Sequence, residues 1–278
     1  MEIENNEPSN LSIFKLTHLQ TSKSMKQIPN IFTLLNLFFG CLAIVAILQN
    51  GIVIQYSPDG NQFIDMPEKI GMASLFIGLA AVVDFLDGFV ARLFKATSAM
   101  GKQLDSLADV VSFGVAPSMI LFQFLRMSLA VEENGINTSA IWLVPAFIVA
   151  CAGAWRLAKF NLDDSQSYGF KGVPIPAVGL VIAALPLIYW NDPDARVINL
   201  LLNKWVLYGV IIILSWLMVS NLPMMALKFK DYSIKNNIPK LILLAVAVVA
   251  ALLLHWLAVP VVFVVYIILS LAFKQKQL

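Results

Sequence analysis

The chain has 278 residues, of which 59% are hydrophobic and only 13% are charged. Together with a mean hydropathy of +0.79, this composition excludes a soluble globular domain and is typical of a protein that crosses a membrane several times. The small net charge of +2 gives no reason to expect a nucleic acid as partner.

Residues 1–28 are polar and predict a cytoplasmic N-terminal arm. The long apolar run that follows Lys26 lacks a convincing small-residue cleavage site, so we expect a retained membrane span and not a signal peptide. Pro29 suits the first helical turn of this span. Asn30 and Thr33 stand near its membrane surface, where the simplest role for their polar side chains is capping.

A second apolar run, residues 71–83, leads directly into a stretch with four aspartates. At about 1.5 Å per residue this run climbs about 20 Å of a hydrocarbon core roughly 30 Å thick, which places the aspartates just inside one membrane interface. A turn over residues 96–101 connects it to a third span over residues 103–127. That span has two of the aspartates in its first two turns and contains Pro117, which we expect to kink it.

The rest of the chain predicts further spans and a final helix pair. The expected spans are a fourth over residues 141–157, a fifth ending near Tyr189, a sixth over 205–219, and two short ones over 238–254 and 258–273. One long tilted helix is the alternative for the final stretch, although its length exceeds what a single span needs. We therefore predict an all-α, polytopic membrane helix bundle with eight transmembrane helices. Residues 29–220 would form a six-helix core, and residues 221–278 a cytoplasmic loop and the C-terminal helix pair.

Basic residues predict the orientation of the bundle. Fifteen of the 19 Lys and Arg residues lie in the N-terminal arm, the C-terminal tail and the loops after the second, fourth and sixth expected spans. By the positive-inside rule, these segments and the aspartates face the cytoplasm. The expected location is the inner, cytoplasmic membrane of the cell.

The four aspartates predict bound metal ions. Asp84 and Asp87 are three residues apart, and Asp105 and Asp109 are four apart, so on helices each pair projects from one face as like charges. Two such charges about 4 Å apart repel by roughly 4 kcal/mol at an effective dielectric constant near 20. Convergent carboxylates therefore favour divalent cations, and ligation by oxygen alone favours magnesium, manganese or calcium over zinc.

A fixed spacing relates the aspartates to neighbouring small and basic residues. The spaced positions are Asp84, Asp87, Gly88, Ala91, Arg92, Gly101, Asp105 and Asp109. This pattern resembles the signature of the CDP-alcohol phosphatidyltransferases. The resemblance implies a membrane enzyme that joins an alcohol to a CDP-activated lipid phosphate and releases CMP, and that is often a homodimer.

The same resemblance implies roles for the aspartates. Two divalent cations, Mg²⁺ or Mn²⁺, would be bridged by Asp84 and Asp105, with Asp87 completing one site and Asp109 the other. Asp109 would also be the general base that takes the proton of the acceptor hydroxyl, which requires that its surroundings raise its basicity.

The resemblance also implies contacts with the CDP-lipid from Asn30, Thr33, Gly88, Arg92 and Ser98. Each of these residues has a simpler structural alternative. Gly88 suits close helix packing, Arg92 suits an arginine that snorkels to the interface, and Ser98 suits a turn.

Two further segments indicate the acceptor. Residues 156–161, RLAKFN, and 170–177, FKGVPIPA, resemble those of bacterial and archaeal phosphatidylserine synthases, which implies CDP-diacylglycerol and L-serine as substrates. Arg156, Lys159 and Lys171 are then candidates to bind the serine carboxylate, although positive-inside topology alone also explains loop cations.

Two alternatives remain open. The first keeps the chemistry and takes glycerol 3-phosphate or an inositol derivative as acceptor, but a phosphorylated acceptor would call for more arginines near the site. The second is a cation transporter that uses the aspartates as its ion pathway. It explains the carboxylates but not Gly88, Arg92 and Gly101 at fixed offsets from them.

Overall fold

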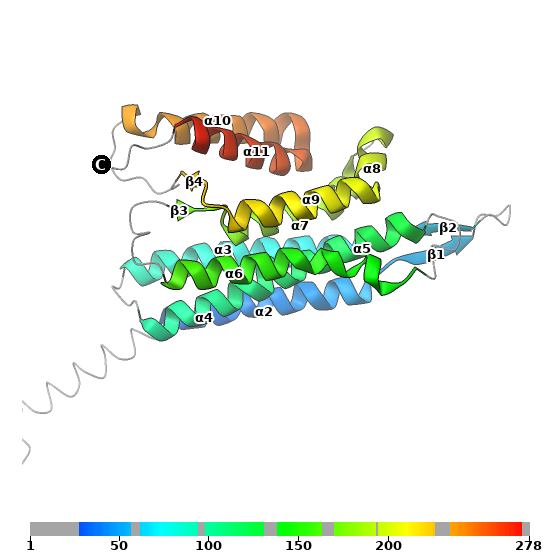
Figure 1. The fold of residues 1–278 in the computed structure, drawn as a ribbon, viewed down its shortest axis with the longest axis horizontal. Helices are drawn as coiled ribbons and strands as arrows, with labels where there is room; N and C mark the ends of the chain where they lie inside the picture. The colour runs from blue at the N-terminus through cyan, green and yellow to red at the C-terminus, as the bar shows by residue number, and fades with distance from the viewer. Residues whose placement is uncertain are drawn as a thin grey trace, which may run out of the picture.

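The helices of the chain run side by side in one elongated bundle (Figure 1). This computed structural model describes residues 28–56, 62–93, 98–130, 138–162, 170–192, 194–225 and 234–273. Nearly all of these residues are helical, which confirms the all-α prediction. Residues 1–27 of the predicted N-terminal arm lie outside the described residues, and Ile28 already belongs to the first described helix.

Several helical segments could cross a membrane by length and composition. Among the described residues they are Pro29–Gln49, Glu68–Ala91, Ala99–Ala130, Ala140–Leu162 and Asn237–Ala272. The helices α8 (Ala195–Leu201) and α9 (Lys204–Val219) meet at a 64° bend and together make a sixth candidate, and α7 (Ile175–Asn191) is apolar but shorter. A polytopic membrane protein is therefore confirmed, whereas the number of eight transmembrane helices stays a prediction.

The first two helices, α2 (Ile28–Gln49) and α3 (Gly71–Leu93), pack along one another. Between them the chain forms a short antiparallel hairpin of β1 (Val53–Tyr56) and β2 (Gln62–Asp65), where the sequence predicted only a polar loop. The one-turn helix η1 (Glu68–Ile70) follows β2 and leads into α3.

The third span contains an irregular segment next to the aspartates. It consists of α4 (Ala99–Asp109), a π-helical turn η2 (Val110–Val115) and α5 (Ala116–Ala130). We expected a kink at Pro117, and the irregularity lies just before it. Proline cannot donate the backbone hydrogen bond to the fourth residue before it and its ring crowds that carbonyl, so a wider helical turn relieves the clash. Gly40 of α2 packs so closely here that a Cβ would collide with Ser112.

The middle of the chain adds helices and a second strand pair. The helix α6 (Ile148–Leu162) follows two short turns, η4 (Ala140–Trp142) and η5 (Val144–Phe147). Strand β3 (Phe170–Lys171) pairs antiparallel with β4 (Pro223–Met224), which follows α9.

The C-terminal helices α10 (Ile234–Leu254) and α11 (Ala258–Ala272) lie side by side (Figure 1). They are joined by the turn η7 (His255–Leu257), where His255 has a positive φ of 49°. The chain therefore folds back at His255, and the single long helix that the sequence left open does not form.

The ends of the bundle differ in what they present. The beginning of α4 and the strands β3 and β4 lie at one end, and the hairpin β1–β2 and α8 lie at the other (Figure 1). Both expected pairs of aspartates lie on helices whose loops connect at the first of these ends.

Candidate active site

Three carboxylates meet between the C-terminal half of α3 and the helix α4. Asp84, Asp105 and Asp109 each offer an oxygen atom, and these three atoms lie within 4.8 Å of one another. Asp109 is buried and the other two are partly buried. At such distances the charges repel strongly, and an all-carboxylate donor set is the type that binds Mg²⁺, Mn²⁺ or Ca²⁺.

Asp87 lies beside this cluster, one helical turn after Asp84, but its carboxylate is not among the three that converge. Its side chain is 7% exposed and accepts a hydrogen bond from the hydroxyl of Thr33 on α2. Its charge still acts on Asp84 and Asp105. The structure thus brings three of the four expected ligands to one point and ties the fourth to α2.

Asn36 belongs to this site and was not identified from the sequence. It is fully buried on α2, and its Nδ2 donates to Asp109 Oδ1 at 3.3 Å. Its own carbonyl accepts from the Ser112 hydroxyl at 3.0 Å, which ties it to the π-helical turn after Asp109. The available signal was its spacing: Asn30, Thr33 and Asn36 form a polar stripe on an otherwise apolar helix.

The beginning of α4 brings together residues expected to bind the nucleotide. Ser98 caps this helix, and its hydroxyl accepts from the Gly101 N–H at 2.9 Å. A Cβ at Gly101 would lie 3.1 Å from both Asn30 Oδ1 and Ser98 Oγ, so the three residues are neighbours. The structural alternative expected for Ser98 was a turn, and its hydroxyl here caps α4.

The other two residues expected to contact the nucleotide lie on α3. Gly88 directly follows Asp87 and is partly exposed. Arg92 lies in the last turn of the same helix, and its side chain falls outside what the structure describes. Contacts of both residues with CDP therefore stay a prediction.

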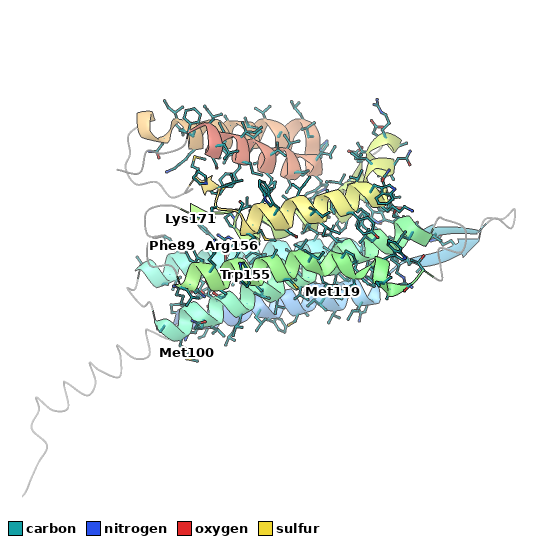
Figure 2. All side chains as sticks on the ribbon, in the orientation of Figure 1. Phe89, Met100, Met119, Trp155, Arg156 and Lys171 are labelled. Atoms are coloured by element: carbon teal, nitrogen blue, oxygen red, sulfur yellow. The ribbon has the colours of Figure 1, made fainter. Side chains whose placement is uncertain are left out.

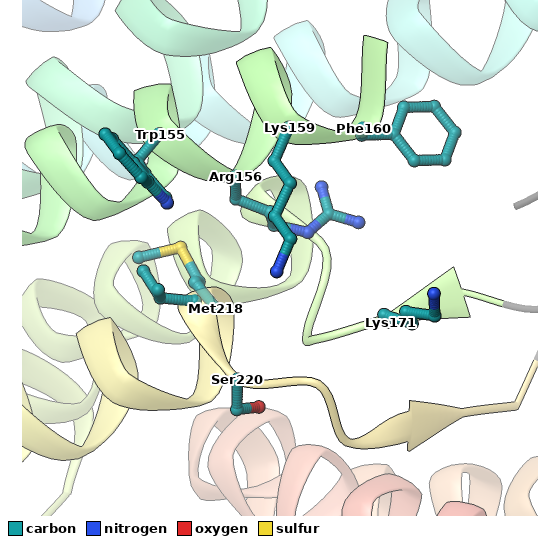
Figure 3. A pocket seen from close by; sticks show the side chains of 8 residues that line it. Trp155, Arg156, Lys159, Phe160, Lys171, Met218 and Ser220 are labelled. Atoms are coloured by element: carbon teal, nitrogen blue, oxygen red, sulfur yellow. The ribbon is translucent and has the colours of Figure 1, made fainter. Parts of the chain in front are cut away.

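The three expected acceptor cations line one hollow. Arg156 and Lys159 extend into it from α6, with Lys159 directed toward the end of α9, and strand β3 carries Lys171 (Figure 3). The remaining lining residues are Trp155, Phe160, Met218, Val219 and Ser220. We call this hollow the cation pocket. Figure 2 shows Arg156 and Lys171 at the end of the bundle where Met100 of α4 also lies.

Arg156 is the innermost cation of the pocket. Its side chain is 8% exposed, and its Nε has no hydrogen-bond partner among the described residues. Its guanidinium lies 5.9 Å from the centre of the Phe160 ring. Lys159 donates to Asn221 Oδ1 at 2.9 Å. A buried guanidinium with an unpaired N–H is suited to an anionic ligand.

The cation pocket adjoins the aspartate cluster. The charges of Arg156 and Asp109 interact. Beside them, Asn161 of α6 donates to the Ser106 hydroxyl of α4 at 2.8 Å, and Lys102 donates to the Asn161 carbonyl at 3.1 Å. The carboxylate cluster and the cation pocket thus share one end of the bundle.

Comparison with known proteins identifies the family. The family model of CDP-alcohol phosphatidyltransferases matches residues 26–225. The chain belongs to this family. Members generally depend on divalent cations, which agrees with the carboxylate cluster. The C-terminal helices α10 and α11 lie beyond the matched residues.

Several curated relatives are similar over much of the chain. A CDP-diacylglycerol–serine O-phosphatidyltransferase of Helicobacter pylori is 33% identical over 226 residues, which cover 81% of this chain and 82% of that protein. The enzyme of the same name from Bacillus subtilis is 34% identical over 59% of this chain and 78% of its own length. An archaetidylserine synthase of Methanothermobacter thermautotrophicus is 33% identical over 58% of each chain.

Proposed function

We propose that this chain transfers the phosphatidyl group of CDP-diacylglycerol to the hydroxyl of L-serine, giving phosphatidylserine and CMP in phospholipid biosynthesis. The observation that carries the proposal is the pairing of a carboxylate cluster with a cation pocket whose innermost residue, Arg156, is buried, in a chain whose relatives are named for this reaction. A metal-held diphosphate and an acceptor carboxylate need these two environments side by side.

The carboxylate cluster is proposed to hold two divalent cations, Mg²⁺ or Mn²⁺. Asp84, Asp105 and Asp109 would be ligands, with Asp87 joining them from its place beside the cluster. When bound, such ions neutralise the diphosphate and stabilise the leaving CMP. Thr33 and Asn36 hold Asp87 and Asp109 in position through the hydrogen bonds described above.

The transfer itself is an in-line displacement. The serine Oγ forms a bond to the phosphorus that carries diacylglycerol, the bond from that phosphorus to the bridging oxygen breaks, and CMP leaves with the electron pair. The proton of the serine hydroxyl passes to the Asp109 carboxylate, which acts as general base. Asn36 orients Asp109 for this step.

The cation pocket is proposed to bind the serine carboxylate. The planar fork of Arg156 suits two parallel hydrogen bonds to a carboxylate, and Lys159 and Lys171 add positive charge. Arg156 is the one arginine among the pocket-lining residues, which favours serine over glycerol 3-phosphate or an inositol phosphate.

The remaining assignments complete the proposal. The CDP moiety would contact Asn30, Thr33, Gly88, Arg92 and Ser98. Residues 29–220 would form the catalytic core and 221–278 a cytoplasmic loop with the helix pair. The protein would lie in the inner membrane with its aspartates facing the cytoplasm, because the segments rich in Lys and Arg lie at the same end of the bundle as the aspartates. The family resemblance also implies a homodimer.

The test is CMP release by the purified protein in detergent micelles with CDP-diacylglycerol. We expect release that needs both serine and Mg²⁺ or Mn²⁺, that stops with a chelator, and that glycerol 3-phosphate or inositol phosphate does not support. Release with another acceptor alone would remove serine from the proposal. If the protein released no CMP with any acceptor but transported divalent cations in vesicles, the transporter alternative would be favoured.

A further inference from the structure

The helix α11 binds the backbone of the residue that follows strand β4. Met225 is buried, and its N–H donates to the Ser270 hydroxyl at 3.1 Å. Its carbonyl accepts from the Tyr266 hydroxyl, also at 3.1 Å. Both polar groups of this residue are therefore satisfied by side chains of one helix.

The two side chains are themselves fixed. Ser270 is 2% exposed and Tyr266 is 8% exposed. The Ser270 hydroxyl donates to the Tyr266 carbonyl at 2.7 Å, so its lone pairs are directed toward the Met225 N–H. Buried hydrogen bonds of this kind hold their partners in one arrangement, because breaking one leaves a buried polar group unpaired.

The position of β4 determines the position of β3. Pro223 pairs with Lys171 and Met224 with Phe170, and the Gly172 N–H donates to the Leu222 carbonyl at 2.9 Å. Gly172 has a φ of 75°, and a Cβ there would collide with the Met218 carbonyl. The strand that carries Lys171 is therefore held tightly against the end of α9 (Figure 3).

We propose that α11 positions the cation pocket: Tyr266 and Ser270 hold Met225, Met225 holds the pair β3–β4, and this pair keeps Lys171 opposite Arg156. The inference rests on the proposed function, because it gives α11 a role in binding the acceptor. Tyr266 also lies within electrostatic range of Arg156. This helix lies beyond the residues that match the family model.

The kinetic test uses the full chain with Tyr266→Phe and, separately, Ser270→Ala. Losing one such hydrogen bond is expected to raise KM for serine roughly three- to tenfold, with kcat and KM for CDP-diacylglycerol within about twofold. Ser270→Thr keeps the hydroxyl, so its KM for serine should be close to that of the wild type. The matched control is Tyr208→Phe, which removes a hydroxyl that donates to the Trp142 carbonyl at 2.6 Å, outside the pocket. It should leave KM for serine unchanged.

A second measurement does not depend on activity. Hydrogen exchange of the Gly172 and Val173 amides, which donate to the carbonyls of Leu222 and Leu217, should be faster in Tyr266→Phe and unchanged in Tyr208→Phe. Unchanged exchange rates of these amides in Tyr266→Phe, or equal changes in KM for serine and for CDP-diacylglycerol, would overturn the proposed role of α11. Wild-type protein that releases no CMP with serine would overturn the proposed function instead, and the exchange measurement would still decide whether α11 holds β3.

Discussion

The aspartate cluster and the cation pocket are neighbours that are built in opposite ways. The cluster comes from two helices that follow one another in the chain, α3 and α4. The pocket needs α6, β3 and the end of α9. Its strand is paired to β4, and α11 binds Met225, the residue after β4. The cluster therefore needs only two successive helices to meet, whereas the pocket depends on packing between segments farther apart in the chain. Substitutions at each should change different kinetic parameters.

The largest effect is expected at the cluster, from Asp109→Asn. Turnover should fall roughly 10²- to 10⁴-fold, because the amide cannot accept the serine proton. The isosteric amide can still accept from Asn36, so thermal unfolding in detergent should change little. Turnover and melting temperature of the purified variant are the measurements.

Asp192→Asn is the control, since it makes the same charge change at the residue that follows α7. It should retain wild-type turnover. Normal turnover in Asp109→Asn would remove the assignment of the general base.

An intermediate effect is expected in the pocket, from Arg156→Lys. The lysine keeps the charge but loses the planar fork. KM for serine should therefore rise roughly 10- to 100-fold, which is the effect expected from losing one hydrogen bond between charged groups. KM for CDP-diacylglycerol should change much less, because the aspartates and not Arg156 are proposed to hold the diphosphate.

Initial rates at varied concentrations of each substrate measure this split. Arg126→Lys, an exposed arginine on α5, is the matched control and should behave as wild type. A parallel rise in both KM values would show that Arg156 serves the whole site and would weaken the distinction between cluster and pocket.

The smallest effect is expected from Thr33→Val, which keeps the shape of the side chain but removes the hydrogen bond to Asp87. Losing such a support for a ligand should raise the Mg²⁺ or Mn²⁺ concentration for half-maximal activity roughly tenfold, with KM for serine unchanged. A metal titration of the activity measures it.

Ser74→Ala is the control here, since this buried hydroxyl has no hydrogen-bond partner among the described residues. An unchanged metal requirement in Thr33→Val would show that Asp87 needs no support from α2.

Much of the cluster could be predicted because the spacing of its residues within each helix is local. Spacings of three and four residues place side chains on one helical face whatever the rest of the fold does, and Asp84, Asp105 and Asp109 do converge. The same rule could have identified Asn36, three residues after Thr33. Which side chain of that stripe meets Asp87 and which meets Asp109 depends on how α2 packs against α3 and α4.

The amino-acid sequence by itself determined the membrane class, the helical fold and the positions of the acidic residues, because hydrophobic length and helical periodicity act over a few neighbouring residues. Only the tertiary structure decided that Arg156, Lys159 and Lys171 share one pocket and that α11 binds Met225. These features join segments far apart in the chain, and their contacts exist only once the helices have packed.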